Sequence, residues 1–224
     1  MAFDNSVLVF CPTSRVEPET VRAIFEQDYA GPHDILFTRD NPYGHDDRED
    51  DYANILHNYR RMRRTFLAGD YEAVWCIESD VIPPRDALSK LMAVEGDTVG
   101  GLYALRYGVE PTSNVFPKGI EAGIGKWMDW DEVGRNWGKV IESGGTCLGC
   151  VLIRREILEQ VDFRSALPCA NDVGWMVDLY RLGKKQMCDL SVVCGHKRPD
   201  GMILWPTERG VEYERREPSF WEVR

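Results

Sequence analysis

Two carboxylates follow a short apolar segment in the first half of the chain. Glu78 and Asp80 stand two positions apart in the stretch WCIESDVIPP, directly after the apolar residues 73–77. Two carboxylates this close repel each other unless a cation lies beside them. Mg²⁺ prefers oxygen ligands and takes one or two protein carboxylates while substrate phosphates supply the rest, and we expect the same of Mn²⁺. The pair is therefore a candidate metal site, although the same acids could instead only cap the turn and the next helix.

Two more residues that could take part in catalysis or metal binding stand at the ends of predicted elements. Asp172 opens a predicted helix, where an acid serves either as a catalytic base or as a simple N-cap. His196 follows a predicted strand, where it could ligate a metal or be an ordinary strand-end histidine. Three glycines before Asp172 in the chain, at positions 144, 145 and 149, permit a tight turn.

The hydrophobic pattern predicts the elements that position these residues. Short apolar runs predict strands, and apolar residues at spacings of three and four predict helices. Strands alternating with helices imply an α/β fold whose sheet is largely parallel in its first half. Ligands bind such sheets beyond the carboxyl ends of the strands, here in loops 12–15, 40–42 and 78–83. We expect strands at 7–10, 34–38, 73–77, 98–105, 139–142, 149–153 and 186–194, and helices from about 18 and at 50–68, 85–94, 154–161 and 172–182.

Overall composition limits the classes of protein. A chain of 224 residues is expected to form one domain. Its formal charge of -10 argues against non-specific nucleic-acid binding, because phosphate neutralisation requires a basic surface. One basic patch exists, and we expect it to be the solvated face of a helix; it comprises Arg60, Arg61, Arg63 and Arg64.

The N-terminal sequence pattern and the cysteine usage lead us to expect a cytoplasmic protein. The start of the sequence lacks the pattern of a secretory signal, and no apolar run has the roughly 18 residues that cross a membrane. The odd number of cysteines, 7, indicates a reducing compartment. Cys147 and Cys150 have the spacing of a zinc or redox motif, but no second pair of that spacing follows.

Several segments, taken in order, resemble the glycosyltransferases of the GT-A fold, in particular family 2. AVWCIESDVIPP is similar to the strand and DxD signature of these enzymes, with Glu78 in place of the usual first aspartate. VLVFCPTSR resembles their first strand and nucleotide-binding turn, and SGGTCLGCVLIRREIL their acceptor-side turn, strand and helix. Asn171-Asp172 resembles their ED motif, and VVCGH matches the strand whose terminal histidine binds metal. The resemblance covers roughly residues 6 to 196.

This resemblance implies a fold and a reaction. It implies a single GT-A domain, a Rossmann-like α/β fold, over residues 1–196, and a tail, 197–224, that packs on or near the active site. The reaction would move a sugar from a nucleotide-diphosphate sugar donor to an acceptor hydroxyl of unknown identity, with inversion favoured and retention left open. The resemblance implies donor-binding roles for Pro12, Thr13, Asp40, Asn58 and Glu78, ligation of Mn²⁺ or Mg²⁺ by Asp80, His196 and Glu78, and a catalytic base at Asp172.

Other interpretations remain open at this point. A zinc-stabilised interaction module without enzymatic activity would use Cys147, Cys150, Cys194 and His196. A sugar nucleotidyltransferase would share the fold and the metal, but the turn after the first strand lacks the glycine-rich phosphate loop that such enzymes use. A degenerate transferase would bind nucleotide without turnover. Aromatic residues of the irregular region 107–138 either bind the acceptor or pack in the core, namely Trp127, Trp130 and Trp137.

Overall fold

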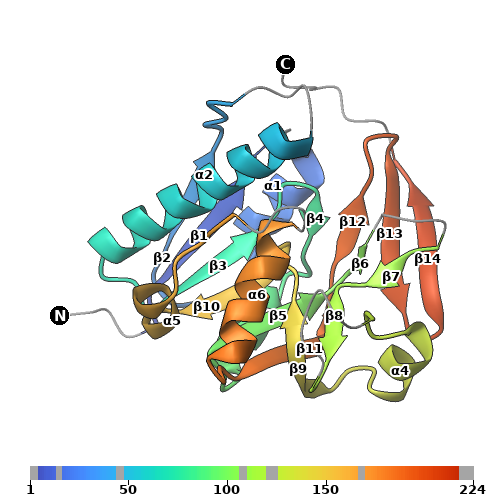
Figure 1. Cartoon of the computed structure of the whole chain (residues 1–224). Coiled ribbons are helices and arrows are strands. Elements are labelled where there is room, and N and C mark those ends of the chain that lie inside the picture. The colour runs from blue at the N-terminus through green and yellow to red at the C-terminus, as the bar shows by residue number, and fades with distance from the viewer. Residues whose placement is uncertain are drawn as a thin grey trace.

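The computed structural model describes residues 5–13, 17–43, 48–105, 110–119, 126–165 and 170–216. An eight-stranded sheet lies at the centre of the molecule (Figure 1). Its strands are β1 (Val7–Pro12), β2 (His33–Thr38), β3 (Ala73–Ile77), β5 (Thr98–Leu102), β8 (Val115–Pro117), β9 (Val140–Thr146), β10 (Cys150–Arg154) and β11 (Gln186–Val193). They lie in the order β2-β1-β3-β10-β5-β11-β9-β8.

The sheet is mixed but mainly parallel, as the sequence predicted. Strands β2, β1 and β3 are parallel neighbours, and β5 and β11 are parallel to each other. β10 lies antiparallel between β3 and β5, so these two strands also share one direction. The carboxyl ends of β1, β2, β3, β5 and β11 therefore meet at one edge of the sheet.

Helices cover both faces of the sheet. On one face lie α1 (Pro18–Phe25) and α3 (Ala87–Ala93), and on the other α2 (Arg48–Ala68), α5 (Arg155–Gln160) and α6 (Asn171–Arg181). Strand β1 shows why, because alternate side chains of a strand point to opposite faces. Val7 and Val9 join the cluster under α1 and α3, whereas Leu8 and Phe10 join the cluster under α2, α5 and α6. Figure 1 shows α2 and α6 crossing the near face.

A second, smaller sheet stands beside the first (Figure 1). It contains β4 (Val81–Ile82), β12 (Gly195–Lys197), β13 (Met202–Thr207) and β14 (Gly210–Arg215), in the order β14-β13-β12-β4. The expected boundary after residue 196 falls inside β12. The described part of the expected tail is thus a β-hairpin, and β12 joins it to the turn that carries Glu78 and Asp80.

The single strand expected at 98–105 is interrupted. β5 ends at Leu102, and β6 (Ala104–Leu105) pairs instead with β7 (Thr112–Ser113). The side chain of Asn114 causes the break, because it accepts a hydrogen bond from the N–H of Tyr103 at 2.9 Å and donates one to the carbonyl of Gly101 at 2.9 Å. These bonds replace the partners that a continuing strand would supply.

The irregular region after residue 106 contributes β7, β8 and a short helix, α4 (Trp130–Arg135), within its described parts. Its tryptophans pack against neighbouring apolar side chains. Trp127 lies on Phe116 with ring centroids 3.8 Å apart, and Trp130 and Trp137 pack against a third apolar cluster. All three tryptophans are half-buried against these clusters.

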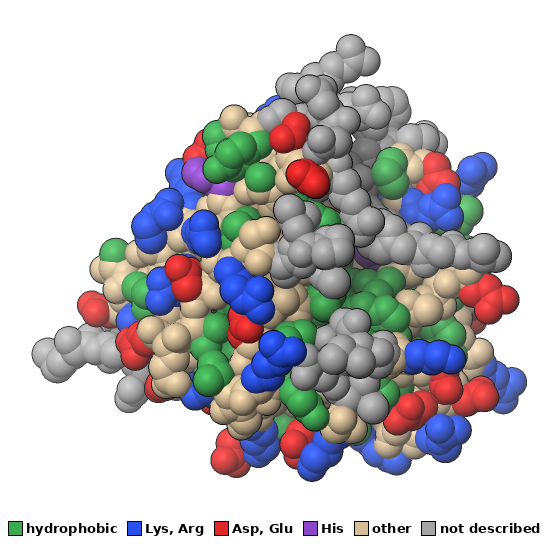
Figure 2. Space-filling model, viewed as in Figure 1, with side chains coloured by type: hydrophobic (Ala, Val, Ile, Leu, Met, Phe, Trp, Pro, Cys, Tyr) green, Lys and Arg blue, Asp and Glu red, His purple; other side chains and the backbone are tan. Residues whose placement is uncertain are grey.

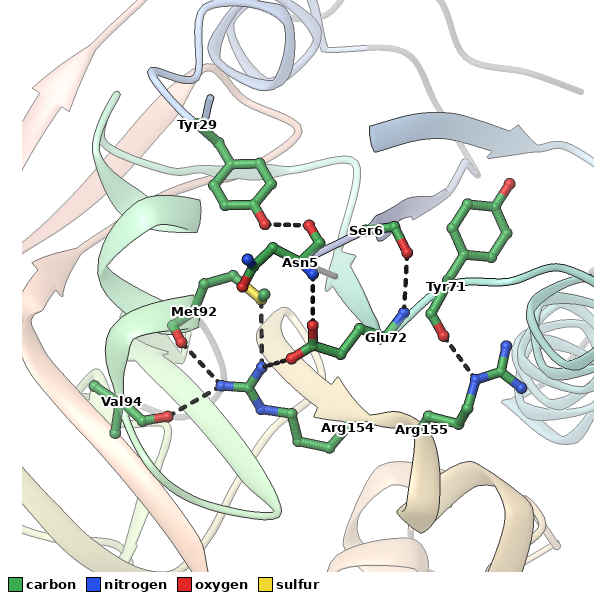
Figure 3. Close-up of polar contacts among 9 residues, drawn as sticks. All are labelled: Asn5, Ser6, Tyr29, Tyr71, Glu72, Met92, Val94, Arg154 and Arg155. Carbon is green, nitrogen blue, oxygen red and sulfur yellow. Dashed lines mark hydrogen bonds and ion pairs between the residues drawn. The ribbon is translucent and has the colours of Figure 1, made fainter. Parts of the chain in front are cut away.

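Two consecutive arginines tie the helices to the edge of the sheet opposite the carboxyl ends (Figure 3). Arg154 donates to the carbonyls of Met92 and Val94 at the end of α3 and forms an ion pair with Glu72 at 3.2 Å. Arg155 points to the other face and donates to carbonyls in the last turn of α2 and just after it, including that of Tyr71 at 2.7 Å. The Arg-Arg pair thus satisfies carbonyls that the helix ends leave exposed.

Lys and Arg side chains gather along the exposed face of α2, while hydrophobic side chains show near β6 and β7 (Figure 2). Two of the arginines on α2 also anchor the neighbouring chain. Arg60 donates to the carbonyl of Phe163 at 2.9 Å, and Arg63 to that of Leu158 at 2.6 Å. No helix in the described residues is both long and apolar enough to cross a membrane.

Candidate active site

The two acids lie in a tight turn at the carboxyl edge of the main sheet. β3 is fully buried up to Ile77, and the chain then turns through Glu78, Ser79 and Asp80 into β4. The N–H of Val81 donates to the carbonyl of Glu78 at 3.0 Å, and the N–H of Glu78 donates to Gly149 at 3.0 Å. One hydrogen bond thus closes the turn, and the other ties it to the residue before β10. The backbone that carries the two carboxylates therefore has a defined position.

The second sheet brings His196 to this turn. β4 and β12 are antiparallel, with His196 opposite Val81, and the N–H of Lys197 donates to the carbonyl of Asp80 at 2.8 Å. His196 Nε2 consequently lies 3.7 Å from Asp80 Oδ1, and both residues are buried. The sequence placed these residues 116 positions apart, and the structure makes them neighbours.

The tautomer of His196 favours a metal ligand. Its Nδ1 lies 2.7 Å from the carbonyl oxygen of Ala104, and a carbonyl only accepts, so Nδ1 carries the proton. In the neutral form of the ring, Nε2 presents its lone pair toward Asp80. A ligating histidine usually donates its other ring N–H to such an acceptor. Tyr103 fixes the ring further, edge to face, with centroids 5.4 Å apart.

Few protein ligands are available for an ion at this place. Within the described part of the chain, no three His, Cys, Asp or Glu side chains gather closely enough to hold a metal. Asp80 and His196 form a pair that suits an ion whose remaining ligands come from water or from substrate phosphates. The four residues of the zinc hypothesis are not gathered into one cluster either. The free thiol of Cys147 hydrogen-bonds to Asp172, whereas the free thiols of Cys150 and Cys194 hydrogen-bond to each other.

Glu78 faces Gly149 and Tyr103. A Cβ atom at Gly149 would lie 2.4 Å from the Tyr103 hydroxyl and 3.1 Å from Glu78 Oε2. The N–H of Gly149 donates to that hydroxyl at 3.1 Å. Glycine at 149 therefore serves more than a turn: only a residue without a side chain admits both the tyrosine and the carboxylate.

Asp172 lies in the first turn of α6 and is not the N-cap, which is Ala170. Burial raises the pKa of the Asp172 carboxyl above its ordinary value, although hydrogen bonds from the N–H of Val173 and from Cys147 oppose this shift. Asp172 and Glu78 both act electrostatically on Tyr103 and Cys147, whose pKa values burial raises first of all. The two acids therefore border one common region.

A cavity of about 270 Å³ lies at the carboxyl ends of β1 and β2. Its wall is formed by side chains from these strand ends, from the start of α1 and from the turn between Glu78 and Asp80. The lining residues are Cys11, Thr13, Glu17, Thr20, Val21, Phe37, Arg39 and Ser79. Thr13, expected to bind the donor, is among them, and its N–H bonds to Thr38 at 2.8 Å. Pro12, also expected there, is the last residue of β1.

Two of the expected donor-binding residues have partners elsewhere. Asp40 hydrogen-bonds to His57 at 2.9 Å and forms an ion pair with Arg61 at 3.3 Å, both on α2, and these contacts lower the pKa of this exposed carboxyl. Asn58 donates to the carbonyl of Asp40 at 3.0 Å and to Asn41 at 3.1 Å. In the structure these two residues hold the loop after β2 against α2, and neither lines the cavity.

Sequence reasoning missed four residues of this region. Glu17 and Thr20, in the wall of the cavity, carry no motif signal because helix starts commonly contain Glu and Thr. Tyr103 was assigned to a strand that the structure interrupts. Lys197 follows His196 directly and was counted as the first residue of the tail, yet it is buried.

Comparisons with known proteins identify the fold. No family model and no curated protein matches the sequence. Among solved structures, A197 from STIV superposes with a TM-score of 0.62 over 97% of this chain and 98% of that chain, at 19% identity. The mannosyltransferase PcManGT from Pyrobaculum calidifontis, in complex with GDP-Man and Mn²⁺, gives 0.50 over 84% of this chain, at 16% identity. Our chain spans only 55% of that enzyme. The protein thus has a GT-A-like glycosyltransferase fold.

Proposed function

We propose that the protein is a metal-dependent glycosyltransferase that uses a nucleoside-diphosphate sugar as donor. The observation that carries the proposal is the approach of Asp80 and His196, 3.7 Å apart, beside a cavity at the carboxyl edge of the sheet. Ser79 lines that cavity and precedes Asp80 in the chain. A base in the cavity would therefore direct its diphosphate toward the Asp80–His196 pair. The mannosyltransferase of similar fold, solved with GDP-Man and Mn²⁺, supports this choice of donor and ion.

Asp80 and His196 would hold Mn²⁺ or Mg²⁺, with Glu78 contributing through water or the donor ribose. The bound ion supplies Lewis-acid stabilisation of the negative charge that grows on the leaving diphosphate. The chain's own residues fix the geometry: Ala104 orients the imidazole, and the β4–β12 pairing holds the aspartate opposite it. The pair fits such an ion because both residues are buried and the imidazole is oriented before any ligand arrives.

Asp172 is the proposed base. Its carboxylate would take the proton of the acceptor hydroxyl while that oxygen bonds to the anomeric carbon and the bond from this carbon to the donor phosphate breaks. Direct attack of this kind inverts the anomeric configuration. Burial suits the role, since it raises the pKa of Asp172 and so makes the carboxylate a stronger base than an exposed aspartate.

The test is a thermal-shift panel of nucleoside diphosphates and nucleotide sugars with and without Mn²⁺. A ligand present at 100 times its dissociation constant adds about 2.7 kcal/mol of stability, which is readily measured. We expect a shift that requires Mn²⁺, disappears in Asp80→Asn and persists in His57→Gln. His57 is the matched control, because its ring contacts the carboxylate of Asp40, which does not line the cavity. The absence of a shift with every nucleotide would refute the proposal.

A further inference from the structure

The proposed base Asp172 is held by the loop between β9 and β10 as well as by its own helix. Within α6 its carboxylate accepts a hydrogen bond from the N–H of Val173 at 2.8 Å. From the loop it accepts hydrogen bonds from the N–H of Leu148 and from the thiol of Cys147. Asp172 itself is only half-buried, so part of its surface stays accessible.

The loop between β9 and β10 is anchored to three other parts of the site. The N–H of Cys147 donates to the carbonyl of Asn114 at 3.2 Å, and the carbonyl of Gly149 accepts from the N–H of Glu78 at 3.0 Å. The N–H of Gly149 donates to the hydroxyl of Tyr103 at 3.1 Å. Every residue of the loop is buried. The loop therefore connects the acidic turn after β3 to the proposed base.

Side chains along this loop form a chain of hydrogen bonds that runs in one direction. The Tyr103 hydroxyl accepts from Gly149 and donates to the sulfur of Cys147, since its contact lowers the pKa of that thiol as a donor does. Burial nevertheless raises the pKa of the Cys147 thiol well above its ordinary value. The thiol thus keeps its proton at neutral pH and donates it to the carboxylate of Asp172. Successive hydrogen bonds of this kind polarise and strengthen one another.

We propose that Cys147 is a positioning residue for the transfer reaction: its thiol, backed by Tyr103, holds the Asp172 carboxylate in the orientation from which it takes the acceptor proton. The inference rests on the glycosyltransferase function proposed above. Cys147 does not line the cavity, so its role concerns the base and not the donor. A cysteine that only filled the core would require volume, whereas this role requires a hydrogen-bond donor.

Other ionisable groups face Asp172 from three elements. Tyr59 of α2 and Tyr103 after β5 both interact electrostatically with it, and burial raises the pKa of each well above its ordinary value, so both are neutral. Glu78, in the turn after β3, acts on these tyrosines and on Cys147. A substitution at Cys147 leaves all three groups in place. A change in the pKa of Asp172 in such a variant therefore reports on the thiol.

The first test is kinetic and compares Cys147→Ala, which removes the donor, with Cys147→Ser, which keeps one. We expect kcat to fall about tenfold in Cys147→Ala with the donor KM unchanged, and most of this loss to be restored in Cys147→Ser. The acid limb of kcat/KM should move to higher pH in Cys147→Ala, because a carboxyl group that loses a donor holds its proton more tightly. Cys188→Ala, at another buried thiol in β11, is the matched control and should change neither quantity.

A second measurement needs no substrate. Carboxyl-carbon NMR, with the Asp172 signal identified by its absence in Asp172→Asn, should give Asp172 a higher pKa in Cys147→Ala than in the wild type or in Cys147→Ser. If Cys147→Ala does not fold, Tyr103→Phe removes the donor behind the thiol and should raise the pKa of Asp172 in the same direction.

The outcomes separate this inference from the function on which it rests. An Asp172 pKa that is equal in the wild type and in the variant lacking the donor would overturn the role of the thiol. Equal losses of kcat in Cys147→Ala and Cys147→Ser would overturn it as well, because packing alone would then explain both. Transfer that is insensitive to Cys147→Ala would overturn this inference alone, whereas the absence of transfer from every nucleotide sugar would refute the proposed function.

Discussion

At Asp172, burial and hydrogen bonding act on one carboxyl group in opposite directions. Burial is the larger influence and raises the pKa, while the N–H of Val173 and the thiol of Cys147 lower it. The ionised form is therefore less favourable in the folded protein than in the unfolded chain. This is a local cost in stability, and it is placed where the proposed reaction needs a base.

Asp172→Asn should remove transfer activity while leaving donor binding in place. We expect kcat to fall by about 10²–10⁴-fold, the usual contribution of a general base, with little change in donor affinity. The wild-type kcat/KM should rise with pH through the raised pKa of Asp172, hence at higher pH than an ordinary aspartate would give. A steady-state pH profile measures both effects. A variant with undiminished kcat would exclude Asp172 as the base.

The same substitution should stabilise the fold at neutral pH. An acid whose pKa is raised on folding binds its proton more tightly in the native state, so its contribution to stability is present at low pH. That contribution is lost as pH rises from the unfolded pKa, about 3.9, through the raised folded pKa. Asn mimics the protonated acid at every pH. Urea unfolding should therefore show that the unfolding free energy of Asp172→Asn, relative to that of the wild type, increases with pH across this window. Equal stabilities at all pH values would contradict the raised pKa.

Gly149→Ala should disturb the proposed site directly. The new Cβ would lie 2.4 Å from the Tyr103 hydroxyl and 3.1 Å from Glu78 Oε2, so the side chains must move. We expect a loss of about 1–3 kcal/mol in unfolding free energy, as for other overpacked positions, and weaker donor binding. Adding Tyr103→Phe removes the nearest oxygen and should restore part of the stability. Unchanged stability in Gly149→Ala would show that Tyr103 and Glu78 move aside without cost.

Among individual residues of the candidate site, sequence reasoning named those that belong to a motif and missed those that do not. Glu78 and Asp80 stood out because paired acids after a buried strand are unusual, and the structure places His196 beside Asp80. Donor binding by Asp40 and Asn58 was predicted from their positions alone. In the structure Asn58, which lies on α2, donates a hydrogen bond to the carbonyl of Asp40. Glu17 was not predictable, because its partner Lys197 lies 180 positions away in the sequence.

Among the elements, the short pairing of β4 with β12 does most to build the site. It joins the turn after β3 to the strand that carries His196 and Lys197, and it makes the C-terminal hairpin part of the fold. Local pattern could not predict this pairing, since β4 has 2 residues and β12 has 3. The longer strands and helices were predictable, because each one buries several apolar residues at a regular period.

The Arg154 contacts at the far edge of the sheet should contribute to stability but not to function. Arg154→Met removes charged hydrogen bonds to the carbonyls of Met92 and Val94 and the ion pair with Glu72. We expect a loss of about 2 kcal/mol in unfolding free energy, with nucleotide affinity unchanged. Arg22→Met, at an exposed position on α1, is the matched control and should cost little. Equal urea midpoints for the two variants would contradict this role.

For the whole molecule, the two sheets meet where the chemistry is proposed. The parallel strands bring the cavity, the acidic turn and the start of α6 to one edge, and the smaller sheet adds His196 to that edge. The protein carries a formal charge of -10, so a diphosphate approaches a molecule of like net charge. A divalent ion at Asp80 and His196 would offset that repulsion locally, which links nucleotide binding to the metal.

The most direct test of the account is the binding of Mn²⁺ itself, followed by electron paramagnetic resonance with and without GDP or UDP. Two protein ligands predict weak binding of Mn²⁺ alone and at least about tenfold tighter binding when a diphosphate completes the site. His196→Gln should lose most of this enhancement, and His57→Gln should keep it. Mn²⁺ binding that does not respond to any nucleoside diphosphate, or that is unchanged in His196→Gln, would contradict the proposed donor site.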